Sequence, residues 1–95
     1  MKSVWKFPLR VANSQCLQIP AGAKILSVQA QGETVCLWAL CDTDALPEPR
    51  YIAIHGTGHE VYDGLLEYIS TFQMHGGALV FHAFEHTSCA VETPK

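Results

Sequence analysis

The stretch that decides the fold is TVCLWALC, residues 34–41, in which every residue after the first is apolar. A strand whose side chains are apolar on both faces is typical of one that is covered on both sides. We therefore predict that residues 34–41 form a central strand. One of its faces belongs to the core, and a second sheet or another subunit covers the other face.

The segments around this strand carry the alternating pattern of half-buried strands. Residues 4–11 alternate in this way, and Pro8 places them at the edge of a sheet because proline cannot donate to a ladder. Gly32 indicates a hairpin turn into residues 34–41, and residues 74–77 indicate a second hairpin loop. Further strands are predicted at residues 16–19, 23–31, 51–55, 68–73 and 78–85.

Two connecting segments interrupt this pattern. Residues 42–50 are predicted to form a loop, because their acidic residues together with Pro47 and Pro49 disfavour a ladder. Residues 60–67 carry apolar residues at a spacing that is compatible with one short helix, although Gly64 weakens it.

Six or seven short strands at this spacing predict an all-β fold, either a small antiparallel sandwich or a barrel. Residues 1–86 are predicted to form a single β domain. Residues 87–95 are polar and are predicted to form a flexible C-terminal tail.

The composition narrows the class of protein. Six Lys and Arg against nine Asp and Glu give the 95 residues a net charge of −3, which argues against binding of duplex nucleic acid. The chain is 48% apolar and 16% charged, so it is too apolar for a disordered protein. No apolar run approaches the roughly 18–20 residues of a membrane span. The first residues lack the apolar stretch of a signal peptide, and we predict a cytoplasmic protein.

A domain of this size has a thin margin of stability, since it buries only about 60–65% of the surface of its unfolded chain. A second subunit is one common remedy. Because so few charged residues cover the surface, we predict a homo-oligomer.

Metal sites or disulfides formed by histidine and cysteine residues are other ways to stabilise a small domain. Histidines four residues apart, as at 55 and 59 or at 82 and 86, chelate zinc when they lie on a helix. Glycine interrupts the first pair and the second lies on a predicted strand, so we predict no metal site. Reduced, mostly buried thiols are predicted, with a disulfide framework or a cysteine zinc site as alternatives. The chain has four cysteines without a C-x-x-C pair: Cys16, Cys36, Cys41 and Cys89.

An ordered set of motifs extends over residues 3–85. The motifs are VWKFPL at 4–9, IPAGAKILSVQ at 19–29, LWAL at 37–40, GTGH at 56–59, YISTFQ at 68–73 and GALVFHAFE at 77–85. This set resembles a family of small proteins of unknown function that are encoded mainly by tailed bacteriophages. The resemblance implies a phage accessory protein that acts in the cytoplasm of an infected bacterial host. Several small phage families of this type bind nucleotide immune signals without cleaving them, and the resemblance favours that role here.

The strongest local feature is HGTGH, residues 55–59, which follows a predicted strand. Gly56 and Gly58 can present backbone N–H groups to an anion, because glycine has no Cβ to block its approach. Thr57 adds a hydroxyl and His59 a donor, and Arg50 supplies a fork that suits phosphate. We predict that this loop and Arg50 hold the phosphates of a ligand. The alternative interpretation is that the two glycines only shape a turn.

Aromatic residues would complete such a site. Trp38, Tyr51 and Phe72 are predicted to stack on the base or to wall it. Gln73 could recognise the edge of a base or a ribose, and His55 and His82 are included in the predicted ligand site.

We therefore expect a non-catalytic protein that binds a small nucleotide signal, such as a cyclic ADP-ribose isomer or a cyclic dinucleotide, without any cofactor. One alternative is a structural or interaction module, either a virion accessory or an inhibitor of a host protein, whose apolar second face makes the contact. A less favoured alternative is a phosphodiesterase with two His-x-Ser/Thr motifs that begin at His55 and His86.

Overall fold

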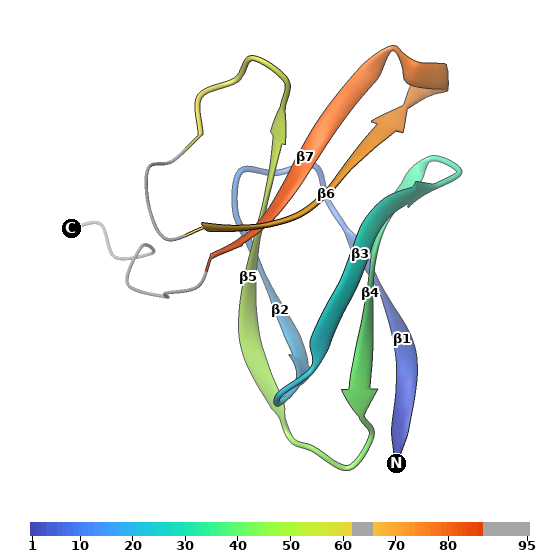
Figure 1. Ribbon diagram of the computed structural model, residues 1–95, viewed down its shortest axis with the longest axis vertical. Coiled ribbons are helices and arrows are strands. Elements are labelled where there is room, and N and C mark those ends of the chain that lie inside the picture. Colours follow the sequence, from blue (N-terminus) through green and yellow to red (C-terminus); the bar gives the residue numbers. More distant parts are fainter. Residues whose placement is uncertain (62–65, 87–95) are drawn as a thin grey trace, which may run out of the picture.

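Seven antiparallel strands make up the fold in this computed structural model, which describes residues 1–61 and 66–86 (Figure 1). One short 3-10 helix joins the last two strands. This confirms the all-β prediction and its strand number. The elements are β1 (Lys2–Leu9), β2 (Gln15–Pro20), β3 (Lys24–Gln31), β4 (Thr34–Asp42), β5 (Pro47–Gly56), β6 (Leu66–Met74), η1 (His75–Gly77) and β7 (Leu79–His86).

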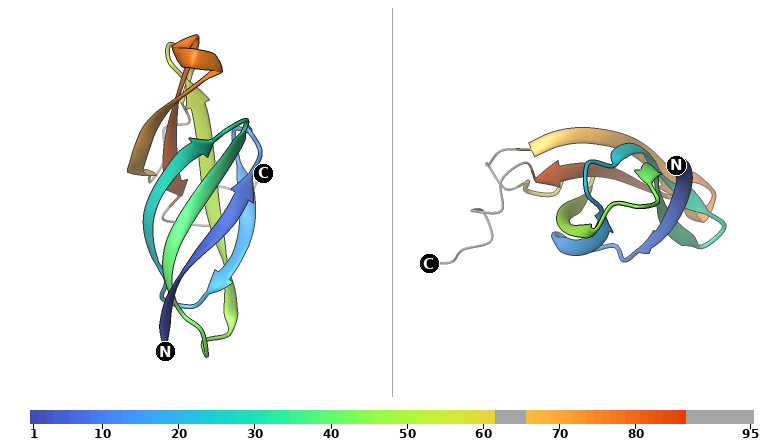
Figure 2. Two further views of the ribbon diagram at one scale, coloured as in Figure 1. Left: turned by 90° about the vertical axis from the view of Figure 1, so that its right-hand side faces the viewer. Right: turned by 90° about the horizontal axis from the view of Figure 1, so that it is seen from below.

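The strands form two sheets, with the orders β1-β4-β3 and β2-β5-β7-β6. The central position of β4 is confirmed, and Pro8 lies on the edge strand β1 as expected. In the left-hand view of Figure 2, β3, β4 and β1 lie side by side in front of β5. The predicted hairpin turns join β3 to β4 and β6 to β7.

The core lies between the two sheets and follows the alternation of each strand. In β4, Leu37 and Ala39 face inward and are fully buried, whereas Trp38 on the opposite face is half-buried. Complete burial of a large aliphatic side chain contributes about 1.5–3 kcal/mol each. The largest of these are Ile19, Val28, Leu37, Ile52 and Ile54.

The strands β3 and β6, which end their respective sheets, lie beside each other. Ser70 Oγ accepts the backbone N–H of Val28 at 3.0 Å and lies 3.3 Å from Ser27 Oγ. Each strand carries a register shift at this level, at Leu26 in β3 and at Ile69 in β6. In Figure 1 the two strands converge toward their ends and separate toward their first residues. The fold is therefore a two-sheet sandwich in which side-chain bonds join one pair of edges.

The predicted loop at residues 42–50 is wrong in its second half, because β5 begins at Pro47. Pro49 pairs with Gln18 of β2, while β7 pairs with β5 only from Tyr51 onward. Within the described residues, the first part of β5 thus has a sheet neighbour on one side only. A strand with one free side accommodates proline, since no ladder bond is lost there.

Two expectations concern residues that lie wholly or partly outside the described ranges. Of the suggested helix at 60–67, residues 62–65 are outside; Glu60 and Val61 belong to no helix, and Leu66 begins β6. The predicted tail at 87–95 lies entirely outside. Among the described residues no helix is long and apolar enough to cross a membrane.

Candidate functional site

The segment after β5 is a tight turn that rests against β7. The N–H of Thr57 donates to the carbonyl of Val80 at 3.2 Å, and the N–H of His59 donates to the carbonyl of Gly56 at 3.1 Å. Gly58 has φ +86°, a conformation that favours glycine. Two of the amide hydrogens expected to hold an anion are thus engaged by carbonyls. This geometry matches the alternative interpretation, in which the glycines shape a turn.

A hydrogen-bonded row of side chains crosses the exposed outer face of the four-stranded sheet beside this turn. His82 Nε2 lies 2.7 Å from Thr57 Oγ1, and His82 Nδ1 lies 3.0 Å from Thr71 Oγ1. Thr71 Oγ1 in turn lies 2.8 Å from the hydroxyl of Tyr68. The row joins the turn after β5 to β7 and β6, three segments that are distant in the sequence.

The row can deliver hydrogen bonds to a ligand. A hydroxyl has one donor and two acceptor positions, and a histidine protonated on both nitrogens only donates. When His82 donates to both threonine oxygens, the Thr57 hydroxyl donates to the carbonyl of Val80, 3.5 Å away, and the Thr71 hydroxyl lies between His82 and the hydroxyl of Tyr68. Thr71 is exposed, so its hydroxyl hydrogen can reach an anion in solution when Tyr68 is the donor to Thr71 Oγ1.

His55 lies on this same face but has a different character. It is the register partner of His82, yet it is only 5% exposed, and neither ring nitrogen has a hydrogen-bond partner among residues 1–61 and 66–86. Burial lowers the pKa of His55, and the nearby His86 and His59 lower it further. The ring of His59 folds over Gly56, since a Cβ there would lie 2.9 Å from two of its ring atoms. His55 is therefore a neutral packing residue, centred 6.2 Å from the ring of Phe84.

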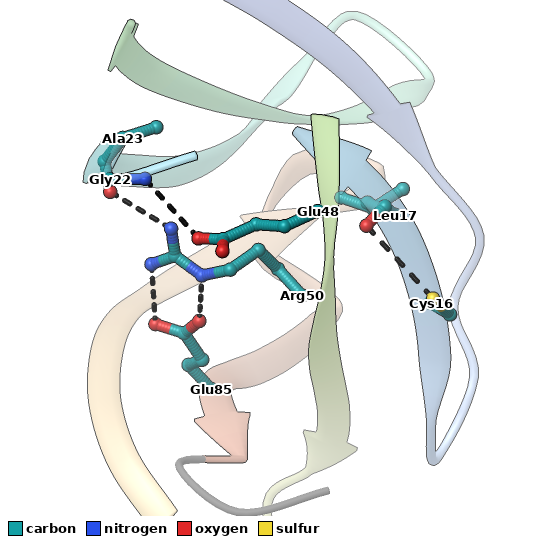
Figure 3. Close-up of polar contacts among 7 residues, drawn as sticks. All are labelled: Cys16, Leu17, Gly22, Ala23, Glu48, Arg50 and Glu85. Atoms are coloured by element: carbon teal, nitrogen blue, oxygen red, sulfur yellow. Dashed lines mark hydrogen bonds and ion pairs between the residues drawn. The ribbon is translucent and has the colours of Figure 1, made fainter. Parts of the chain in front are cut away.

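Arg50 is not at the turn but in the first half of β5 (Figure 3). Gly56 lies six positions further along the strand, which corresponds to about 20 Å. Its Nε and Nη2 donate to the Glu85 carboxylate, and Nη1 donates to the carbonyl of Ala23 at 2.9 Å. The hydrogen bond with Glu85 raises the pKa of Arg50 above its usual value. The predicted pairing of Arg50 with the loop is thus not formed; its fork holds Glu85.

The predicted aromatic residues are dispersed. Phe72 is 2% exposed and packs in the core against Phe81, so it has no face open to a ligand. Trp38 lies on the outer face of the other sheet, and Tyr51 lies in the middle of β5, away from the turn. Gln73, in contrast, is exposed on the same face as His82 and reaches toward Gly77.

Tyr68 and Thr71 belong to the row but were not predicted as site residues. Three residues apart on a regular strand, their side chains would lie on opposite faces. The register shift at Ile69 brings both to the outer face. Tyr68 is 59% exposed, which is unusual for a large aromatic side chain. No feature of the sequence marks the shift, so the pair could not have been found from periodicity.

The structure also places the residues considered for a phosphodiesterase, for a metal site and for disulfides. His55 and His86 are both buried and are not register partners, because His86 pairs with Tyr51. No group of three histidine, cysteine or acidic side chains is placed to hold a metal within residues 1–61 and 66–86. Cys16, Cys36 and Cys41 are free thiols, the last two buried.

Comparison with known proteins places the chain in a family. A family model described as Domain of unknown function (DUF7352) matches residues 1–93, which is nearly the whole chain. No curated protein and no solved structure matches it. The sequence motifs and the seven-stranded fold are thus features of a member of this family: the chain belongs to the DUF7352 domain family.

Proposed function

We propose that this protein binds and sequesters a small anionic nucleotide without cleaving it. The observation that carries the proposal is the position of His82 between the hydroxyls of Thr57 and Thr71 on an exposed face. The binding surface would be this row rather than the backbone of the turn or Arg50.

The row suits a phosphate group because it offers convergent donors. When His82 and Tyr68 both donate to Thr71 Oγ1, the Thr71 hydroxyl is held in place and can turn its own hydrogen outward. Hydrogen bonds to a charged acceptor contribute about 1.5–3 kcal/mol, more than those between neutral groups. The His59 side chain, exposed at the end of the turn, adds a further donor within the same region.

The base would lie against Tyr68. Its ring is 59% exposed and is supported edge-on by Phe84, with ring centres 5.9 Å apart. Stacking of a base on an aromatic ring is worth about 1–3 kcal/mol. Gln73, on the same face, offers an amide that can donate to and accept from a base edge.

The biological role follows from the resemblance to small bacteriophage proteins. In this role the protein would act in the cytoplasm of an infected bacterium and remove an immune signal, either a cyclic ADP-ribose isomer or a cyclic dinucleotide. Self-association would place two such faces around one ligand. Native mass spectrometry of the purified protein measures both the oligomer and any nucleotide that remains bound.

Calorimetry against a panel of cyclic dinucleotides and cyclic ADP-ribose isomers tests the proposal. We expect one class to bind, and Thr71→Val and His82→Phe to weaken that binding at least tenfold. Thr34→Val, an exposed threonine on the other sheet, is the matched control and should bind normally. Chromatography should recover the ligand intact. Absence of binding across the panel would refute the proposal, and a cleaved product would favour the phosphodiesterase alternative.

An interaction module is the second candidate, and one observation favours it. The outer face of the three-stranded sheet exposes Val4 and Leu26 at 54% and 45%, next to half-buried Trp38 and Leu40. Isolation of one stoichiometric protein partner whose binding is lost in Val4→Glu would support this candidate over nucleotide binding.

A further inference from the structure

The hydrogen-bonded row on the outer face of the four-stranded sheet consists of Thr57, His82, Thr71 and Tyr68, in that order. Each hydroxyl in it both donates and accepts. A neutral histidine carries a single N–H, so it donates at one ring nitrogen and accepts at the other. The row can therefore run in either of two directions, and the two directions leave different groups facing a ligand.

Two distances at Thr57 decide the direction. Thr57 Oγ1 lies 2.7 Å from His82 Nε2 but 3.5 Å from the carbonyl oxygen of Val80. Its one hydrogen can serve only one of these acceptors, and hydrogen bonds from a hydroxyl group are strongest at about 2.5–3.0 Å. The Val80 carbonyl also accepts the backbone N–H of Thr57 at 3.2 Å. The Thr57 hydroxyl therefore donates to Nε2, and a neutral His82 carries its hydrogen on Nδ1.

This direction leaves one hydrogen over at the other end of the row. His82 Nδ1–H donates to Thr71 Oγ1, 3.0 Å away, so the Thr71 hydrogen is not needed at the histidine. Thr71 Oγ1 and the Tyr68 hydroxyl, 2.8 Å apart, hold two hydrogens but share one hydrogen bond. Over residues 1–61 and 66–86, the second hydrogen of this pair has no acceptor in the row and is available to a ligand.

The opposite direction would leave lone pairs instead. With the ring hydrogen on Nε2, Thr57 would accept from His82, Thr71 would donate to Nδ1, and Tyr68 would donate to Thr71. Every hydrogen of the row would then be used within it, and the free oxygen lone pairs at Thr71 and Tyr68 would repel a phosphate oxygen. The position of one hydrogen on His82 thus decides whether this end of the row attracts an acceptor or a donor.

A ligand can reach the end of the row where this hydrogen is left over. Thr71 is exposed, and Tyr68 is 59% exposed. The ring of Phe84 packs edge-on against Tyr68, with ring centres 5.9 Å apart, and supports the phenol beside Thr71. The two hydroxyls therefore form an accessible donor pair, whereas Thr57 acts on that pair only through His82.

We propose that Thr57 is a positioning residue of the nucleotide site: by donating to His82 Nε2 it directs the row so that Thr71 and Tyr68 present a hydroxyl hydrogen to the ligand. The ligand group bound there is an unprotonated phosphoryl oxygen, as in a phosphodiester or a pyrophosphate, because such an oxygen only accepts. This inference rests on the proposed function and adds to it the residue that sets the preference for an acceptor.

The ¹⁵N NMR signals of the His82 ring test the direction, because a ring nitrogen changes its shift when it carries a hydrogen. At pH 8, above the value of about 6.5 at which a free imidazole titrates, we expect the hydrogen on Nδ1. Thr57→Val should lose this preference, whereas Thr57→Ser, which keeps the donor, should retain it. Tyr68→Phe should also retain it, because the direction is set at the Thr57 end. A hydrogen on Nε2 or on both nitrogens in the wild-type protein, or an unchanged ring in Thr57→Val, would overturn the proposal.

Binding of dimethyl phosphate, a phosphodiester without a base, supplies the second arm and is followed by amide shifts at residues 68–71. Thr57→Val should weaken it by about two- to tenfold, as expected for one neutral hydrogen bond, and Thr57→Ser should restore it. Thr34→Val is again the control and should bind normally, and uncharged trimethyl phosphate should bind more weakly than dimethyl phosphate. Equal binding by the wild-type protein and Thr57→Val, or no shifts at residues 68–71, would overturn this inference. The calorimetric panel tests the proposed function separately, so a nucleotide that binds there would leave that function standing.

Discussion

Ser70 Oγ accepts the buried N–H of Val28 at 3.0 Å, and this bond joins the edge of one sheet to the edge of the other. Here a side chain connects two neighbouring strands, whereas backbone hydrogen bonds connect them elsewhere in the fold. The bond marks the point at which β3 and β6 stop running together, and a groove of about 340 Å³ between Lys24–Leu26 and Glu67–Ile69 begins there.

Ser70→Ala should therefore destabilise the protein by about 1–3 kcal/mol, because it leaves the Val28 N–H buried without a partner. Ser27→Ala is the matched control, since it removes the 3.3 Å contact with Ser70 and an exposed 3.4 Å hydrogen bond from Gln29 but preserves the bond to Val28. Urea denaturation of both variants measures the difference. Equal losses in the two would show that the Val28 bond contributes nothing of its own.

Arg50→Met should cost about 3–5 kcal/mol, because the Glu85 carboxylate then remains mostly buried without its partner. The double variant Arg50→Met, Glu85→Met removes both charges and should recover a large part of that loss. Chemical denaturation of the single and double variants completes the comparison. A double variant no more stable than the single one would contradict this account of the pair.

Lowering the pH should reduce the stability of the folded protein, because His55 is buried. Its folded-state pKa lies below 6.5, so the unfolded chain binds a proton as the pH falls through about 6.5 while the folded protein does not. Stability attributable to His55 is complete above that pH and is lost as the pH falls toward its folded pKa. Denaturation of the wild-type protein and His55→Leu between pH 5 and 7.5 should give a smaller slope for the variant. Identical slopes would show that His55 does not cause the acid sensitivity.

The two glycines of the turn should respond differently to alanine. Gly58 has φ +86°, so Gly58→Ala should cost about 1–2 kcal/mol in backbone strain. Gly56 is not in the left-handed region, and its new Cβ would meet only the ring of His59, an exposed side chain that can turn away. Gly56→Ala should cost less and should shift the NMR signals of His59. A larger loss for Gly56→Ala than for Gly58→Ala would contradict this reading of the turn.

Much of the fold could be predicted because its causes are local. The apolar run of β4 requires cover on both faces, and this placed β4 at the centre of a sheet. Pro8 cannot donate to a ladder and lies on an edge strand, while Gly32 permits the hairpin into β4 with φ +63°. The same reasoning about proline was wrong at Pro47 and Pro49, because a strand tolerates proline where one side has no neighbour.

The sequence by itself determined an all-β chain, its approximate strands and the turn at residues 55–59, since periodicity and glycine act within a few residues. Tertiary structure alone decided which polar groups meet. Glu85 reaches Arg50 across 35 residues, and His82 reaches Thr57 across 25. Register shifts at Leu26 and Ile69 then changed which side chains share a face. Such partners depend on how distant strands pair, and a one-residue shift in that pairing leaves no local mark in the chain.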